Sequence, residues 1–215
     1  MITVSAFRSV PPFAQGLVRD LRVRWALEEV GQPYAVQLIG PEEKDSAAYR
    51  AKQPFGQVPV IEDDGFVLFE SAAIVMRIAE KHDALLPTNA EARSRVISWM
   101  FAAMNTIEPH IQNLTVLDLS YAKEDWAKQR RPGLLDLAQK RLAALSDFMK
   151  DRDYLEGDRF TAADLLMTTV LRIPRHIDLI ATMPVLEAYR LRCEARPAFK
   201  RALDAQMADF AKAAA

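Results

Sequence analysis

The stretch Gln53-Pro-Phe-Gly-Gln-Val-Pro-Val60 and the stretch Phe69-Glu-Ser-Ala-Ala-Ile74 that follows it decide the fold of this chain. Pro59 stands at the start of a β-rich run, where a proline donates no hydrogen bond to a strand ladder. It fits this place if the Val58–Pro59 bond is cis, because the turned chain then presents the backbone N–H and C=O of Val58 outward. An extended peptide ligand can pair with Val58 there as an added strand.

The pair Glu70 and Ser71 lies where a predicted hairpin ends and a helix begins. A helix N-terminus offers free N–H groups and a partial positive charge, which suit a carboxylate ligand. The Ser71 hydroxyl can also bind that carboxylate, and Glu70 can accept from an ammonium group. Together with Val58, these residues predict a site for a peptide with a free α-amino-carboxylate head. The alternative is that Ser71 is only a helix cap and Pro59 only an edge proline.

Around these stretches, strand and helix signals alternate over residues 1–83. The patterns predict strands at 2–7, 34–39, 58–62 and 66–69, and helices at 17–30, 46–52 and 71–82. Asp63-Asp64-Gly65 predicts the turn of a hairpin, because Asp-Gly turns favour positive φ. The order is βαβ, a short helix, and then ββα, which indicates a small α/β domain.

Strand signals vanish after the linker Leu85-Leu86-Pro87, and residues 84–215 read as an all-helical domain. Apolar residues at helical spacing predict helices over 92–117 and 132–150, and further helices begin near Thr161, Pro184 and Pro197. Pro109 is expected to kink the first of these helices. Thr161 and Asp164 predict a capping box at the start of the third.

The bulk composition excludes several classes of protein. The chain has 215 residues and a formal net charge of −1, so no strong field directs it to nucleic acid or acidic membranes. Its single cysteine, Cys193, makes an internal disulfide impossible and favours a cytoplasmic location. We find no apolar run of membrane-spanning length, no secretory signal, no cluster with metal-ligand spacing and no phosphate-binding glycine loop.

These segments together resemble one known family. Gly56-Gln-Val-Pro-Val60 followed by Phe69-Glu-Ser-Ala-Ala-Ile74 resembles the glutathione-binding signature of the cytosolic glutathione transferases. Three other segments resemble that family's first helix, its buried capping box and its C-terminal segment: 24–34, 160–165 and 188–199. The resemblance runs in order along nearly the whole chain. It implies an N-terminal thioredoxin-like domain followed by a C-terminal all-helical bundle, the glutathione transferase fold.

The resemblance also implies a ligand and a mode of assembly. Val58, presented by Pro59, would pair with the cysteinyl backbone of glutathione, while Glu70 and Ser71 would hold its γ-glutamyl end. Two glutamines, Gln53 and Gln57, take the places of the asparagine and lysine that are usual in the family, and Gln57 could reach the glycyl carboxylate. Glutathione would be a co-substrate, no metal is implied, and family members usually form homodimers.

The group that activates the glutathione thiol is harder to assign. Members of the family that this chain resembles carry a hydrogen-bond donor near the end of the first strand. This donor stabilises the glutathione thiolate and so lowers the pKa of the thiol. Here the loop 8–16 is longer than usual, no tyrosine precedes Tyr34, and the first domain has no cysteine. Ser9 falls nearest the expected place, and Arg8, Gln15 or a loop N–H are the alternatives. Arg19 is a further charge near the helix, and Ser5 reads as a structural residue of the strand.

The sequence therefore predicts an enzyme that adds the glutathione thiolate to a small hydrophobic electrophile, a reaction of detoxification. The electrophile pocket would be lined by the loop after the first strand and by the long helix of the second domain, at Val10, Pro12, Phe13, Ala103, Met104 and Ile107. For most of the helical residues, packing in the core of the bundle is the simpler explanation. Other readings are a glutathione-dependent isomerase or peroxidase, a binding protein that holds glutathione or a similar peptide without turnover, and a partner protein that has lost the ligand.

Overall fold

The structure is a computed structural model that describes residues 1–214, and its contacts form two compact units. Unit 1 comprises Met1–Leu86 together with the chain from Ala195 onward, and unit 2 comprises Pro87–Glu194. The last helix therefore packs with the α/β part of the chain, although the sequence pattern groups it with the helical part.

Unit 1 is built on a four-stranded sheet in the order β2-β1-β3-β4. Its strands are β1 (Ile2–Phe7), β2 (Tyr34–Ile39), β3 (Val60–Asp63) and β4 (Phe66–Phe69). β1 and β2 are parallel, and the β1–β3 and β3–β4 pairs are antiparallel. The hairpin turn between β3 and β4 has positive φ at Asp64 (49°) and Gly65 (86°), as the Asp-Gly signal predicts.

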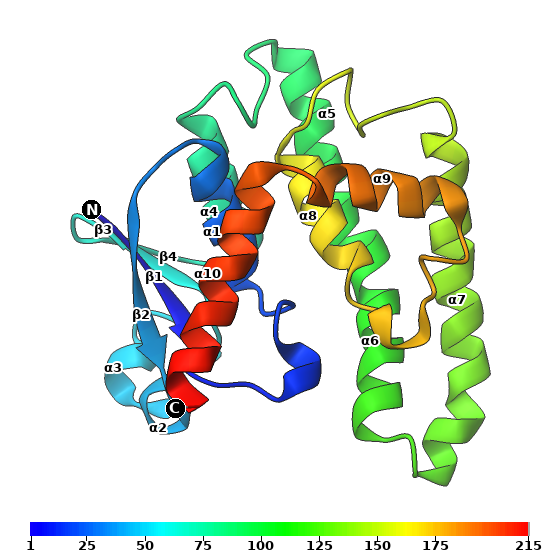
Figure 1. Ribbon diagram of the computed structural model, residues 1–215, viewed down its shortest axis with the longest axis horizontal. Coiled ribbons are helices and arrows are strands. Elements are labelled where there is room, and N and C mark those ends of the chain that lie inside the picture. The colour runs from blue at the N-terminus through cyan, green and yellow to red at the C-terminus, as the bar shows by residue number, and fades with distance from the viewer. Residues whose placement is uncertain (215) are drawn as a thin grey trace. The chain divides into compact units, whose positions relative to one another are not determined.

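The helices of unit 1 are α1 (Asp20–Glu29), α2 (Pro41–Asp45), α3 (Ala47–Arg50), α4 (Ser71–Glu80) and α10 (Pro197–Ala214). α1 and α4 contact each other and the sheet, and α10 lies along α1 (Figure 1). The predicted thioredoxin-like arrangement is confirmed. α1 begins later than predicted, because Gly16 adopts a φ of 75° and residues 17–19 form a turn.

A buried polar cluster attaches α10 to α1. Arg24 donates from Nε to Asp20 (2.8 Å) and from Nη2 to Asp209 (2.8 Å). The side-chain amide of Gln206 donates to Asp20 Oδ1 (2.8 Å) and to the carbonyl of Val18 (3.2 Å). Burial raises the pKa of Asp20, although Arg24 opposes this. The last helix is thereby tied to the segment that leads from β1 into α1.

All the regular secondary structure that is described for unit 2 is helical. Its helical elements are α5 (Ala90–Phe101), η2 (Ala102–Ile107), α6 (Glu108–Ser120), α7 (Asp125–Met149), α8 (Ala162–Leu171), η3 (Arg175–Ile177) and α9 (Pro184–Glu194). Every residue of α8 is buried, so this helix forms the centre of the bundle. None of the described helices in either unit is both long and apolar enough to cross a membrane.

The start of α8 confirms the predicted capping box. Asp164 accepts four hydrogen bonds of 2.9 Å, from the N–H of Leu155, the N–H and hydroxyl of Thr161, and the hydroxyl of Tyr189. Burial raises the pKa of Asp164, and these bonds act against that rise. A single carboxylate therefore joins the start of α8 to α9 and to the loop before α8.

The prolines of unit 2 act in two different ways. Pro109 interrupts the predicted helix 92–117, as expected: a π-helical segment, η2, separates α5 from α6 directly before it. The prediction that a helix begins at Pro132 is wrong, because α7 runs through this residue from Asp125. Ala127 and Leu134 are both buried on the inner face of α7, so packing on either side of the proline outweighs one lost hydrogen bond.

Candidate functional site

The residues singled out in the first domain meet at one edge of the sheet of unit 1. Val58 belongs to a buried cluster with Ile39, Tyr49 and Val60, and three partly buried residues pack against this cluster. Those three are Phe7 at the end of β1, Val18 before α1 and Phe69 at the end of β4. The same apolar cluster therefore lies beside the loop after β1, the Val58 segment and the start of α4.

The Val58–Pro59 peptide bond is cis, as the sequence predicts. Both residues are buried, and β3 begins only at Val60. Within the described residues, neither the N–H nor the C=O of Val58 is hydrogen-bonded. An extended peptide can therefore pair with this backbone without displacing an existing bond.

Glu70 and Ser71 form the entry to α4. Glu70 is exposed and has φ 72° and ψ 112°, a conformation that strains any residue with a side chain. The structure corrects the expectation that Ser71 caps the helix: Glu70 holds the N-cap position, and Ser71 is the first helical residue. Its side chain is buried, and its Oγ accepts a hydrogen bond of 3.3 Å from Nη1 of Arg22. A serine hydroxyl, a helix N-terminus and a guanidinium therefore lie together.

The two glutamines have different environments. Gln53 is buried, and its Oε1 accepts a bond of 2.6 Å from the N–H of Phe55, so it shapes the loop. Gln57 has an exposed side chain, and its backbone carbonyl accepts a bond of 2.8 Å from the Tyr49 hydroxyl. Only Gln57 has a side chain that is open to solvent.

The candidate activating residues lie on the segment between β1 and α1. Ser9 is exposed, and its hydroxyl has no hydrogen bond within the described part of the chain. Arg8 is held by an ion pair of 2.7 Å with Glu43, and its N–H bonds the carbonyl of Ile39. Gln15 is half-buried and ends the short helix η1 (Pro12–Ala14). Of these three residues, Ser9 is the one with a hydroxyl, and this hydroxyl is open to a ligand.

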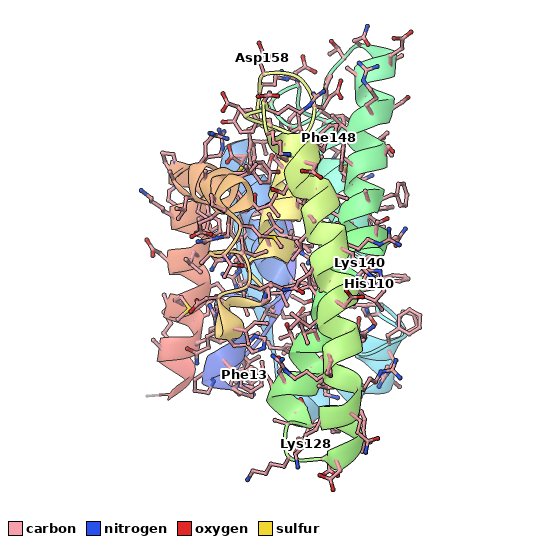
Figure 2. The ribbon with its side chains drawn as sticks, turned by 90° about the vertical axis from the view of Figure 1, so that its right-hand side faces the viewer. Phe13, His110, Lys128, Lys140, Phe148 and Asp158 are labelled. Atoms are coloured by element: carbon pink, nitrogen blue, oxygen red, sulfur yellow. The ribbon has the colours of Figure 1, made fainter. Side chains whose placement is uncertain are left out.

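The predicted electrophile-pocket residues divide between the two units. In unit 1, Val10 is half-buried and Pro12 is exposed, and Phe13 is 52% exposed on η1 (Figure 2). In unit 2, Ala103 and Ile107 are buried on η2, and Met104 is half-buried there.

A nearby aromatic pair on the bundle shows how unit 2 is packed. The centre of the Trp99 ring of α5 lies 4.6 Å from that of the Phe148 ring on α7, so Trp99 packs within the bundle.

Three residues near the site were not assigned a binding role from the sequence. Arg22 contacts Ser71, and Ser5 and Tyr49 share a hydrogen bond of 2.9 Å beneath the Val58 segment. Two signals in the sequence could have pointed to Ser5 and Arg22. Ser5 is a polar residue at an inward position of β1, and Arg22 is a charged residue on the inner face of α1. The structure shows no group of metal-binding side chains among the described residues.

Known protein families match most of the chain. The sequence model of the glutathione S-transferase N-terminal domain matches residues 21–87, and that of the C-terminal domain matches residues 100–197. A maleylacetoacetate isomerase of Rhizobium meliloti is 32% identical over 84% of this chain and 89% of its own.

The chain belongs to the glutathione S-transferase family. The glutathione S-transferase GstA of Escherichia coli O157:H7 is 27% identical over 84% of this chain and 90% of its own. A glutathione transferase family member of Pseudomonas fluorescens, solved with two glutathione molecules bound, has a TM-score of 0.82 at 24% identity, covering 94% of this chain and 92% of that one. These relatives support a glutathione transferase-like enzyme, and the solved structure establishes the fold.

Proposed function

We propose that this glutathione transferase-like enzyme binds glutathione at the edge of the sheet in unit 1 and adds its thiolate to a small hydrophobic electrophile. The observation that carries the proposal is the combination of an unpaired Val58 backbone with the buried Ser71–Arg22 contact at the start of α4. The first can pair with a cysteinyl backbone, and the second with a γ-glutamyl carboxylate. The Pseudomonas fluorescens relative, whose structure contains two glutathione molecules, supports this ligand.

In the proposed complex, each residue has a separate task. The N–H and C=O of Val58 form two backbone hydrogen bonds with the cysteinyl residue, and cis Pro59 shapes this turn. Ser71 and the first N–H groups of α4 bind the γ-glutamyl carboxylate, and Glu70 accepts from its ammonium group. Gln57 reaches the glycyl carboxylate. Gln53 acts indirectly, because its bond to the N–H of Phe55 holds the loop.

The thiol activator in this proposal is Ser9. A hydroxyl donor stabilises the thiolate relative to the thiol and so lowers the thiol pKa. The exposed and unbonded hydroxyl of Ser9 supports this choice, whereas Arg8 is engaged with Glu43. Val10, Pro12 and Phe13, with Ala103, Met104 and Ile107, are the proposed electrophile contacts. Arg8, Gln15 and a loop N–H remain the alternative activators.

The proposal is tested by isothermal titration of glutathione into the wild type and Ser71→Ala. We expect the wild type to bind, and the variant to bind about tenfold more weakly, since a hydrogen bond to a charged group is lost. Equal affinity in the two proteins would contradict the ligand assignment. Ser9→Ala should bind glutathione normally but lose turnover. Undiminished turnover in this variant would mean that Arg8, Gln15 or a backbone donor activates the thiol.

A second candidate function is glutathione-dependent isomerisation, favoured by the 32% identity to a maleylacetoacetate isomerase. In such a reaction the thiolate adds to a conjugated double bond, the former double bond rotates, and elimination returns glutathione unchanged. Incubation with maleylacetoacetate distinguishes the two functions. Isomerised product with constant glutathione would establish the isomerase, and consumption of glutathione would establish conjugation.

We further propose that the enzyme is a cytoplasmic homodimer. Exposed apolar side chains near β3 and β4 support an interface there: Phe55 (63% exposed), Phe66 (43%) and Val67 (37%). Sedimentation of Phe55→Ser should show more monomer than the wild type, while Leu191→Ser, an exposed apolar control on α9 of unit 2, should not. A cytoplasmic location suits an enzyme that needs reduced glutathione, and the single cysteine is compatible with it.

A further inference from the structure

A chain of hydroxyl groups lies beneath the Val58–Pro59 segment. The N–H of Val60 donates to Ser5 Oγ at 2.7 Å, Ser5 Oγ lies 2.9 Å from the hydroxyl of Tyr49, and Tyr49 donates to the carbonyl of Gln57 at 2.8 Å. The chain therefore begins directly after Pro59 and ends directly before Val58. It joins β3, β1 and α3 around the two residues that carry the proposed cysteinyl contact.

The direction of each hydrogen bond in this chain is determined. A carbonyl only accepts, so the single proton of the Tyr49 hydroxyl goes to Gln57. The bond between Ser5 and Tyr49 must then use the proton of Ser5, whose lone pair accepts from Val60. Every hydroxyl proton and the amide proton are used, and such completely paired buried networks hold their members in one arrangement.

The side chains replace pairing that the sheet does not provide. The β1–β3 ladder ends at Val4 opposite Ile61, and Pro59 has no N–H to extend it. The next residue along β1 is Ser5, and its side-chain oxygen accepts the hydrogen bond from the N–H of Val60. Tyr49 then holds the other side of the segment, and the Val58 side chain packs in the same cluster as the Tyr49 ring.

We propose that Ser5 and Tyr49 are positioning residues for glutathione binding, because they fix Gln57 and Val60 and thereby orient the free backbone groups of Val58. This inference rests on the proposed function, since it concerns the same site. The N–H and C=O of Val58 contribute fully to the affinity for glutathione only if they already point toward the ligand. Ordering a backbone segment on binding costs entropy, and this cost opposes association. Burial raises the pKa of the Tyr49 hydroxyl more than its bond to Ser5 lowers it, which keeps the donor protonated.

The inference is tested with Tyr49→Phe, Ser5→Ala and the double variant. Calorimetry gives the dissociation constant for glutathione, and steady-state kinetics give KM for glutathione and for 1-chloro-2,4-dinitrobenzene as a model electrophile. We expect each single variant to weaken glutathione binding about tenfold, with KM for the electrophile unchanged. Because the two hydroxyls act in series, the double variant should bind nearly as well as either single variant.

Tyr154→Phe is the matched control. Tyr154 lies in unit 2, where its ring packs near Phe160 at 6.0 Å, and its hydroxyl has no hydrogen bond among the described residues. This variant should keep wild-type affinity for glutathione. If Tyr49→Phe does not fold, Ser5→Ala tests the same chain from its other member.

The outcomes separate this inference from the proposed function. If the wild type binds glutathione and folded Tyr49→Phe and Ser5→Ala bind it equally well, the positioning role is wrong and the proposed function stands. A rise in KM for both substrates by the same factor would also overturn the inference, because it would indicate a general loss of structure. A wild type that binds no glutathione would overturn the proposed function and, with it, this role.

Discussion

Nη1 of Arg22 lies 3.3 Å from Oγ of Ser71, so a buried guanidinium supports the first residue of α4. A guanidinium only donates, and the Ser71 oxygen therefore accepts this bond. The proton of the Ser71 hydroxyl remains available to a carboxylate. The charge of Arg22 adds to the partial charge of the helix N-terminus, so the entry to α4 favours an anion.

Arg22→Met should weaken glutathione binding about tenfold, because a buried charge beside the carboxylate is removed, and Arg22→Lys should weaken it less. The measurement is calorimetric titration with glutathione and with glutathione whose γ-glutamyl α-carboxylate is an amide. The wild type should prefer the natural ligand, and Arg22→Met should show a smaller preference, because Ser71 and the N-terminus of α4 still favour the carboxylate. Arg77→Met is the control, since Arg77 of α4 lies over the Phe66 ring at 4.0 Å. An unchanged preference in Arg22→Met would contradict this role.

Glu70→Gly should separate stability from binding. The strain of φ 72° at Glu70 costs about 1–3 kcal/mol, while the added freedom of glycine in the unfolded chain costs about 0.5–1 kcal/mol. We therefore expect thermal unfolding at an equal or higher temperature, together with weaker glutathione binding because the ammonium acceptor is lost. Glu70→Gln, which keeps the strain and removes the charge, should lower affinity without raising stability. A marked loss of stability in Glu70→Gly would contradict the strain.

Asp164→Ala should destabilise the protein by about 3 kcal/mol or more, because four buried donors lose their acceptor. Chemical unfolding measures this free energy. The matched control is Asp136→Ala on α7, where Asp136 is 58% exposed and pairs with exposed Lys140, so the change should stay below about 0.5 kcal/mol. Similar losses in the two variants would mean that the Asp164 bonds contribute little.

Asp118 predicts a specific pH dependence of stability. Burial acts to raise its pKa, but hydrogen bonds from Arg131 and His176 outweigh burial, and the pKa lies below its ordinary value of 3.8. A carboxylate with a lowered folded pKa stabilises the fold above its unfolded pKa, and this stability is lost as pH falls through the folded pKa. The Arg131 side chain is 38% exposed, so Asp118→Asn should cost only about 1 kcal/mol near neutral pH.

Urea unfolding of the wild type and Asp118→Asn at several pH values tests this dependence. The difference in unfolding free energy should be constant above about pH 5 and should shrink below about pH 4. A difference that grows as the pH falls would contradict the lowered pKa.

The sequence predicts the fold from local signals, and it fails where packing decides. The Asp-Gly turn, the Val58–Pro59 bond and the Thr161–Asp164 cap are short-range features, and the structure confirms each of them. Pro132 misleads, because burial of the inner face of α7 on both sides of it is a tertiary effect. The same limit applies to the candidate site.

The contacts that distinguish this site join residues far apart in the chain. Arg22 and Ser71, and likewise Ser5 and Tyr49, come together only when the helices and strands pack. Single residues such as a serine inside a strand carry no signal of their partner. The sequence therefore predicts the groups that would face the ligand, but not those that hold them in place.

The most direct test of the account is an ultraviolet titration of the thiolate of glutathione bound to the wild-type enzyme. If the loop after β1 activates the thiol, the thiol pKa of bound glutathione lies clearly below that of free glutathione, and Ser9→Ala returns it toward the free value. A bound thiol whose pKa is no lower than that of free glutathione would contradict the transferase reaction and leave a protein that only binds the peptide.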